Sequence, residues 1–260
     1  METEETKKAL NTDRQIRRLG VFLTIPLVAV IIVLCFLGAE WRETLLVQRI
    51  IVEGARILPV KYINTLTEIK NSTMMRDLNL YDIQEKLRVE PFIKNICVTR
   101  QYPDAININI TERVPIATVN SKQLRYIDNE GILLPYLETA VKLDLPIING
   151  VKGIENAKIG KAIENSEIHE AIQILQTALA IDSTMYRFIS EVNMKDGDDV
   201  LLFSTEAAIP IILGRDNYPA KLLMLQTFWS NYVRLQNTDR LRQIDLRFND
   251  QVVVKWVTDN

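Results

Sequence analysis

Few residues in this sequence have the side chains and the spacing that catalysis or metal binding requires. The chain contains one histidine, His169, and two cysteines, Cys35 and Cys97. A zinc site made of such side chains needs about four ligands, so these three residues are too few. The sequence has no Gly-rich phosphate loop, no G-x-S-x-G turn and no H-E-x-x-H helix. We therefore expect no metal, no cofactor and no small-molecule substrate.

The remaining candidates for chemistry are better explained as structural residues. His169 lies beside the apolar stripe of a predicted helix, and the sequence identifies no partner of the kind that a general base needs. Cys97 falls on the polar side of a predicted strand and has no histidine to activate it. Asp128 and Glu130 stand in a predicted turn, where acidic residues usually serve the backbone. These observations favour a protein that is not an enzyme.

The N-terminal sequence has the pattern of a membrane anchor. Residues 19–39 contain no charged side chain and supply the roughly 20 apolar positions that a membrane-spanning helix needs. Arg17 and Arg18 precede this segment, and Trp41 follows it where an aromatic residue would lie in the membrane interface. The positive-inside rule then places residues 1–18 in the cytoplasm and exports the rest. A cleaved signal peptide would have a shorter apolar segment, and a buried soluble helix would rarely lack a polar face, so we favour the anchor.

Composition excludes several classes of protein. The 260 residues are 47% hydrophobic and 25% charged, which is typical of a folded protein and excludes a disordered, collagen-like or disulfide-based chain. The formal net charge of −2 also argues against nucleic-acid binding. Because Cys35 lies in the predicted span, Cys97 is the only exported cysteine, and no intramolecular disulfide can form there. A packed core must therefore stabilise the exported part.

The first exported segment predicts a small α+β unit. A strand ends at Gly54, and helices begin at Pro59 and Leu80. Residues 92–102 and 105–111 form a strand pair, in which isoleucines alternate with polar residues along the second strand. We expect those isoleucines in a core and the polar residues in water. The order strand, helix, helix, strand, strand places two helices on one face of a short sheet.

The second exported segment predicts a β-rich unit with two helices. The first helix covers residues 164–181, with Ile168, Ile172, Leu175 and Leu179 on its buried face. The second runs from Pro219 to about Leu235 and is capped by Asp216 or Asn217. The predicted strands are residues 118–119, 125–127, 132–134, 146–150, 188–194, 200–205, 207–213, 242–248 and 251–257.

The last predicted strand is a candidate binding surface. Residues 251–257 are rich in β-branched and aromatic side chains and end the folded sequence. If this strand lies at a sheet edge, its unpaired backbone groups would accept a strand from a partner. In the alternative interpretation, Trp256 belongs to the core and Lys255 guards the edge. The sequence leaves both interpretations open.

Short sequence fragments along the chain resemble one known family. The exported part begins with Val47-x-x-Ile50-x-Val52-x-Gly54, and residues 80–117 contain Glu112-Arg113 and Pro115-x-Ala117. Later fragments are Ile127-Asp128 with Gly131, Leu145-Pro146 with Gly150, Leu213-Gly214-Arg215 with Lys221-Leu222, and Ile244-Asp245-Leu246-Arg247. Their order and spacing behind one N-terminal anchor resemble the bacterial cell division family FtsQ/DivIB.

The resemblance implies a fold and a domain order. It implies a cytoplasmic tail at residues 1–18 and a transmembrane helix at residues 19–39. A POTRA-like βααββ module would follow at residues 46–116, and a β-domain with the partner-binding strand at residues 117–258. The protein would cross the inner (plasma) membrane once, with its C-terminal domain in the periplasm or its equivalent.

The resemblance also implies a function and a site. It implies a non-enzymatic scaffold of the division septum that binds the membrane proteins FtsB and FtsL, together with other divisome membrane proteins. Carried over by position, the contact residues are Arg247, Phe248 and Trp256; Phe248 replaces the tyrosine familiar in the family. The pairing edge is the backbone of Gln251, Val252, Val253, Val254, Lys255, Trp256 and Val257.

Two other functions remain as alternatives. One is a single-span envelope-assembly or secretion protein with a POTRA-like module, although such proteins usually repeat the module. The other is a membrane-anchored enzyme, which would need a polar cluster that the sequence does not show. Depletion would separate them, since filamentous cells indicate a division defect and envelope leakage an assembly defect.

Overall fold

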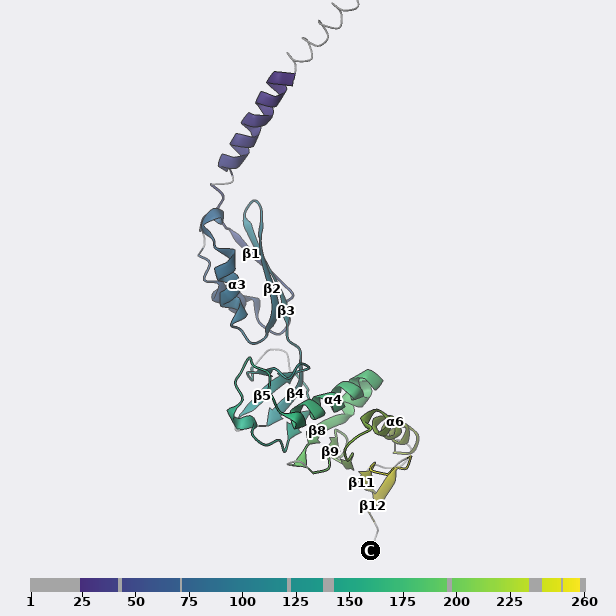
Figure 1. Cartoon of the computed structure of the whole chain (residues 1–260). Coiled ribbons are helices and arrows are strands. Elements are labelled where there is room, and N and C mark those ends of the chain that lie inside the picture. The colour runs from purple at the N-terminus through teal and green to yellow at the C-terminus, as the bar shows by residue number, and fades with distance from the viewer. Residues whose placement is uncertain are drawn as a thin grey trace, which may run out of the picture.

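The computed structural model describes residues 24–41, 44–70, 72–120, 123–137, 143–195, 198–233, 240–248 and 250–257. An apolar helix, Thr24–Trp41, begins the described chain, has a mean hydropathy of 2.2 and buries none of its length against the rest of the protein. Figure 1 shows this helix standing apart from the folded units. By length and composition it can cross a membrane. It continues two residues past the predicted end at Ala39; Arg17 and Arg18 lie outside the described residues.

The first folded unit, which we call the three-stranded unit, has the predicted βααββ order. β3 lies in the centre of its sheet, parallel to β1 and antiparallel to β2. Ile106, Ile108 and Ile110 of β3 are buried among the helices, as the alternating pattern predicts. Asn107 differs from that prediction, because its Oδ1 is buried rather than in water. The elements are β1 (Arg49–Glu53), α2 (Val60–Thr67), the 3₁₀-helix Met75–Asp77, α3 (Leu80–Arg88), β2 (Ile93–Gln101) and β3 (Ala105–Glu112).

Local sequence explains where the elements of this unit begin and end. Pro59 precedes α2, and the side chain of Asn79 caps α3 by accepting a hydrogen bond from the N–H of Tyr81. Gly54 ends β1 with φ +86°, and a Cβ at this position would lie 1.9 Å from the carbonyl oxygen of Ile110. Both its backbone angle and the close approach of β3 therefore require glycine.

The second folded unit, the nine-stranded unit, contains one mixed sheet. Its strand order is β12-β11-β10-β9-β8-β7-β4-β5-β6. Three pairs in it are parallel: β4 with β7, β7 with β8, and β10 with β11. The strands are β4 (Pro115–Asn120), β5 (Leu124–Asp128), β6 (Leu133–Leu134), β7 (Ile147–Asn149), β8 (Ile189–Asn193), β9 (Leu201–Ser204), β10 (Pro210–Ile212), β11 (Leu241–Asp245) and β12 (Val253–Trp256).

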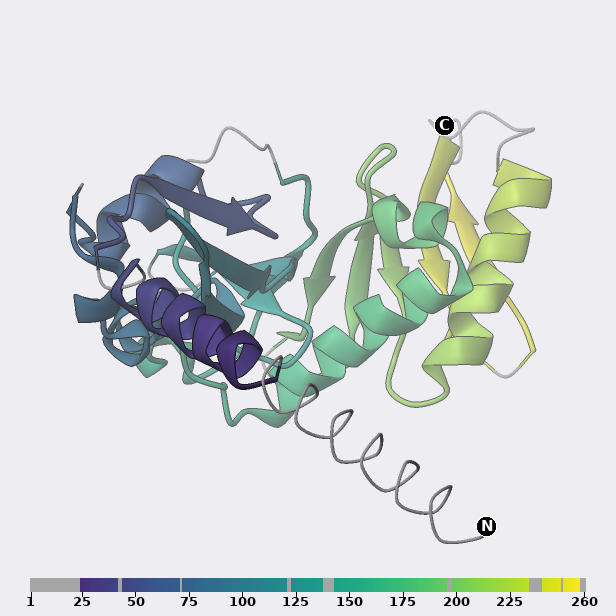
Figure 2. The ribbon, with the colours of Figure 1, turned by 90° about the horizontal axis from the view of Figure 1, so that it is seen from above.

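Helices cover one face of this sheet. α4 (Ser166–Ile181) and α6 (Tyr218–Phe228) lie side by side on it (Figure 2), and both contribute to the main core. The prediction for Leu179 was wrong: it is 50% exposed, and Ala178 is buried instead. A short helix, α5 (Ser183–Phe188), was not predicted, and Phe188 ends this helix rather than beginning a strand.

The second helix begins as predicted, with Asn217 as the N-cap residue of α6 and Pro219 in the first turn, although Asn217 makes no side-chain capping hydrogen bond. The predicted end at about Leu235 lies outside the described residues. α6 ends at Phe228 and continues as a π-helical turn, Trp229–Val233.

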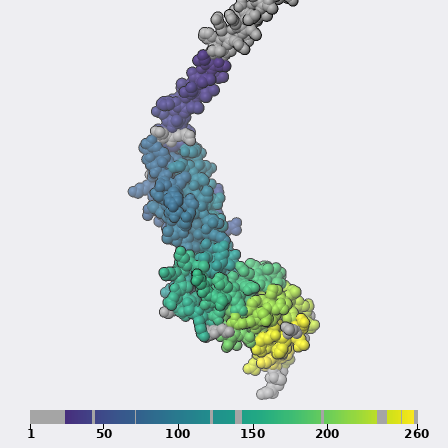
Figure 3. All heavy atoms as spheres, in the orientation of Figure 1, coloured from purple at the N-terminus to yellow at the C-terminus, as the bar shows by residue number. Residues whose placement is uncertain are grey.

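The two units meet through a shared apolar and charged junction. Tyr126 and Leu134 belong to the nine-stranded unit by sequence, but they are buried in the core of the three-stranded unit. Arg113, just after β3, donates from Nη1 to Asp128 and to Glu130, each at 2.7 Å. The units follow one another along an elongated molecule (Figure 3), and these contacts join them.

Candidate partner-binding site

β12 is the edge strand of the nine-stranded sheet. It pairs antiparallel with β11, from Trp256 opposite Leu241 to Val253 opposite Asp245, with an irregularity between Leu241 and Gln243. Beyond the strand, the N–H of Val257 donates to the carbonyl of Arg240 at 2.8 Å. Within the described residues no strand pairs with the outer side of β12. In an edge strand, backbone groups on that side are available to another strand.

The side chains along β12 divide into a packed set and an exposed set. Val252 and Val254 pack against the main core and anchor the strand. Val253, Trp256, Val257 and the neighbouring Phe248 are large apolar residues with exposed fractions of 40%, 41%, 48% and 50%. Gln251 and Lys255 are also exposed. Trp256 therefore does not belong to the core, and exposed apolar side chains surround the open edge.

The opposite edge of the sheet is built differently. β6 has two residues, Leu133 and Leu134, and both are buried. The segment at Gly160–Lys161 covers it, because the N–H of Leu133 donates to Lys161 and its carbonyl accepts from Gly160. Of these two edges, β12 is the one that a partner strand can reach.

Two carboxylates hold Arg247 at the end of β11. Its guanidinium donates to Asp245 at 2.6 Å and to Asp199 at 3.0 Å. The Cγ of Arg247 also packs against Gly214, where a Cβ would lie only 2.9 Å away. The Asp245 pair is partly buried, because the Asp245 side chain is 15% exposed, whereas the Asp199 pair is exposed on both sides. Hydrogen bonds from Arg247 hold the pKa of Asp245 below its usual range.

The corner around Arg247 brings separate sequence fragments together. Lys221 of α6 is buried, and its Nζ donates to the carbonyl of Arg215 at 2.9 Å and to Asp216 at 3.2 Å. Arg215 and Tyr218 both donate to the carboxylate of Glu170 on α4. The fragments Leu213-Gly214-Arg215, Lys221-Leu222 and Ile244-Asp245-Leu246-Arg247 therefore meet at Gly214, which lies against both the Cγ of Arg247 and the Nζ of Lys221. This contact brings the residues after β11 next to α6.

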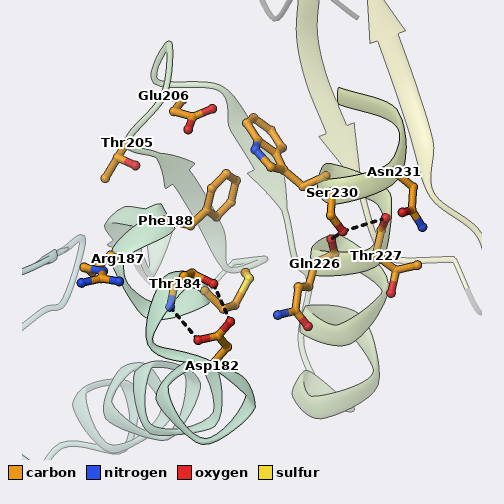
Figure 4. Close-up of a pocket in the computed structure, with 12 residues that line it drawn as sticks. Asp182, Thr184, Arg187, Phe188, Thr205, Glu206, Gln226, Thr227, Ser230 and Asn231 are labelled. Carbon is orange, nitrogen blue, oxygen red and sulfur yellow. Dashed lines mark hydrogen bonds between the residues drawn. The ribbon is translucent and has the colours of Figure 1, made fainter. Parts of the chain in front are cut away.

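A hollow lies between α5 and α6. Its volume is about 690 Å³, and its floor is formed by Phe188 and Trp229, whose rings meet edge to face at 4.5 Å. Figure 4 shows local hydrogen bonds of some of its polar side chains: Asp182 caps α5 through Thr184, and the Ser230 hydroxyl donates back to α6. These contacts stabilise helix ends and do not assemble a nucleophile with a base.

The residues that the sequence offered as candidates for catalysis or metal binding make no catalytic arrangement within the described residues. Asp128 accepts from the N–H groups of Glu130 and Ile132 at 2.9 Å and 2.8 Å and pairs with Arg113, so it shapes the turn. His169 is exposed on α4 beside Gly131, and Cys97 is exposed on β2. Across the described part of the chain, no three His, Cys, Asp or Glu side chains are grouped so that they could hold a metal ion.

The structure separates the predicted site residues into two groups. Val252 to Trp256 lie on or beside the edge strand, although the strand proper is shorter than the predicted residues 251–257. Arg247 and Phe248 lie beyond the end of β11, which stops at Asp245 and not at Phe248. Asp199 and Gly214, which contact and position Arg247, were not predicted from the sequence. Gly214 belongs to Leu213-Gly214-Arg215, one of the fragments that carry the family resemblance, and this was the one sequence feature that could have indicated its role.

Comparison with known proteins agrees with this architecture. The family model described as "FtsQ/DivIB, C-terminal related" matches residues 114–255, more than half of the chain, and "POTRA domain, FtsQ-type" matches residues 45–113. The chain is 28% identical over 232 residues to "Cell division protein FtsQ" of Rhodothermus marinus, covering 86% of this chain and 83% of that one. The protein of the same name from Salinibacter ruber is 27% identical, covering 88% and 90%. A third, from Syntrophotalea carbinolica, is 28% identical, covering 91% and 83%. The chain therefore belongs to the FtsQ/DivIB family of cell division proteins.

Proposed function

We propose that this protein is a non-enzymatic scaffold of the bacterial division septum. In this proposal residues 1–18 are cytoplasmic, residues 19–39 anchor the chain, and residues 46–116 and 117–258 form the two exported domains. FtsB and FtsL, membrane proteins of the same machinery, are the proposed partners. The observation that supports the proposal best is the open, apolar edge of β12 on a protein of this family.

The edge supports recognition by strand addition. A partner segment in extended conformation would form backbone hydrogen bonds along Val253–Trp256, and its alternate side chains would meet Val253, Trp256 or Val257. Val252 and Val254 are already packed into the core, so the edge is held in place before the partner binds. Such preorganisation lowers the entropic cost of association.

Arg247 supplies charge recognition in this proposal from two residues beyond the end of β11, where it contacts Asp199 and Gly214 on the β9 and β10 side of that strand. Its pair with Asp199 is exposed on both sides, so exchanging Asp199 for a carboxylate of the partner costs little. Its contact with the more buried Asp245 keeps the guanidinium in place during that exchange. We therefore expect the bound segment to carry an acidic residue next to its apolar strand.

Titration of this protein with the exported segment of FtsB from the same organism tests the proposal. Trp256→Ala and Phe248→Ala remove exposed aromatic side chains, and truncation of such contacts costs about 2 kcal/mol or more of binding free energy. Arg247→Gln removes the charge. We avoid Arg247→Glu, because it would place a third carboxylate beside Asp245 and Asp199 and destabilise the fold.

The matched control is Tyr81→Ala, which removes an aromatic side chain that is 66% exposed on α3, far along the chain from β12. We expect wild type and Tyr81→Ala to bind equally and the three site variants to bind more weakly while remaining folded. Equal binding by all five proteins would show that β12 is not the site. No binding by wild type would overturn the choice of partner.

A further inference from the structure

One end of the three-stranded unit carries a group of exposed apolar side chains. Leu46, Met74 and Tyr102 have exposed fractions of 38%, 41% and 50%. They come from three separate segments: the chain entering β1, the loop before the 3₁₀-helix, and the turn between β2 and β3. We call this group the membrane-proximal face.

Backbone hydrogen bonds bring the three segments together. Leu46 and Met74 form an isolated β-bridge, and the N–H of Met75 donates to the carbonyl of Leu45 at 2.8 Å. The N–H of Gln48 donates to the carbonyl of Asp104, in the β2–β3 turn, at 2.9 Å. Figure 1 shows the tip of this hairpin at the end of the unit that faces the N-terminal helix. Backbone hydrogen bonds therefore hold the segments of the membrane-proximal face together.

The short linker between the apolar helix and the folded unit places this face close to the bilayer. Trp41 is the last residue of the apolar helix, and Leu45, four residues later, is already hydrogen-bonded into the folded unit. Four residues span at most about 14 Å, and the headgroup layer is about 6 Å thick on each side. The face therefore stands within reach of the headgroups of the leaflet from which the helix emerges.

The chemistry of the face suits a lipid interface. Tyrosine and tryptophan are favoured at the boundary between headgroups and hydrocarbon, because their rings are apolar and their polar atoms remain hydrated. The acidic residue of the turn, Asp104, pairs with Arg49 at 2.7 Å, which neutralises its charge toward anionic lipids. Met74 and Leu46 add apolar surface without charge.

We propose that Leu46, Met74 and Tyr102 lie in the headgroup layer and form a second membrane contact beside the helix. This inference rests on the proposed anchoring of residues 19–39. A helix alone leaves the exported part free to tilt, whereas a second contact fixes its orientation. Because the contacts of Arg113 with Asp128 and Glu130 join the two units, we expect the second contact also to restrict the height of β12 above the bilayer.

Nitroxide labels on the full-length protein in liposomes of phosphatidylcholine and phosphatidylglycerol test the proposal. In a background of Cys35→Ser and Cys97→Ser, single cysteines are introduced by Met74→Cys, Tyr102→Cys and, as control, Val89→Cys. Val89 is 80% exposed just after α3, which extends about 14 Å along its axis away from Met74. Collision rates with oxygen and with a water-soluble nickel complex then report the depth of each label.

We expect the ratio of oxygen to nickel collisions to rise several-fold at positions 74 and 102 relative to position 89. Equal, aqueous ratios at all three positions, in protein that floats with the liposomes after an alkaline wash, would overturn the contact and leave the anchor intact. Raised ratios at all three positions would overturn the choice of face. Protein that fails to float would overturn the anchoring itself, and the second contact with it.

Discussion

Removal of the Arg113 side chain is expected to destabilise the protein more than removal of any surface ion pair near it. The Arg113 side chain is 17% exposed and contacts Asp128, which is 2% exposed, and Glu130, which is 45% exposed. Arg113→Ala leaves the Asp128 carboxylate buried without its cation. The same change releases the contact between the two folded units.

The structure sets the size of the effect. Breaking a buried ion pair by removing one partner costs about 3–5 kcal/mol. Asp128 keeps two backbone hydrogen bonds, from Glu130 and Ile132, so part of its charge stays compensated. We therefore expect a loss near the lower limit, about 3 kcal/mol of unfolding free energy. Lys94→Ala removes the exposed pair with the same Glu130 and should cost less than about 1 kcal/mol.

Urea unfolding of the chain without its apolar helix, residues 44–260, measures both variants. This part can be used alone because both cores lie within it and the apolar helix buries nothing against it. The double variant Arg113→Ala with Asp128→Asn tests the cause, since the neutral amide no longer needs a cation. We expect its loss to be smaller than the sum of the two single losses. An Arg113→Ala loss no larger than that of Lys94→Ala would show that the buried Asp128 carboxylate does not depend on its cation.

Three further predictions concern other positions. Gly54→Ala should cost at least about 2 kcal/mol of unfolding free energy, since it adds a left-handed backbone penalty to a clash with Ile110; an unfolding midpoint equal to that of wild type would contradict this. Glu112→Ala should cost about 3 kcal/mol of unfolding free energy, because the Glu112 carboxylate accepts hydrogen bonds from the N–H groups of Arg56, Ile57 and Leu58. Urea unfolding measures this loss, and a loss below about 1 kcal/mol would mean that water replaces the carboxylate. Arg247 lowers the pKa of Asp245 in the folded state, so the ionised Asp245 stabilises the fold above the unfolded pKa of about 4, and this stability is lost as pH falls through the folded pKa. The difference in unfolding free energy between wild type and Arg247→Gln should therefore narrow below about pH 4. A difference that stays constant with pH would contradict this.

Local pattern predicted the three-stranded unit well. The two-residue period of β3 identifies its buried isoleucines, because a strand with one covered face imposes that period on its own sequence. Pro59 and Gly54 mark boundaries through their own backbone preferences. Each of these signals acts within a few residues.

The prediction failed where distant packing decides. Leu179 fits the apolar period of α4 but is half-exposed, because Ala178 takes the buried position at the end of that helix. α5 follows α4 directly and has six residues, too few for a periodic pattern, and Asp182 both ends one helix and caps the next.

The site could be predicted in part. The composition of residues 251–257 indicates a strand, but its position at the sheet edge depends on the parallel pairing of β10 with β11, which no local pattern encodes. The pair of Arg247 with Asp199 joins residues 48 positions apart. The resemblance marked Arg247 as a contact residue, and the structure adds what holds it in place.

Amide hydrogen exchange of β12, with and without the exported segment of FtsB, tests most directly whether this protein receives a partner strand. Strand addition converts exposed backbone N–H groups of Val253–Trp256 into hydrogen-bonded ones, which exchange more slowly. We expect new protection at β12, with the buried edge strand β6 and the exposed edge strand β2 unchanged. Saturating partner that leaves exchange at Val253–Trp256 as fast as in the free protein would contradict the account.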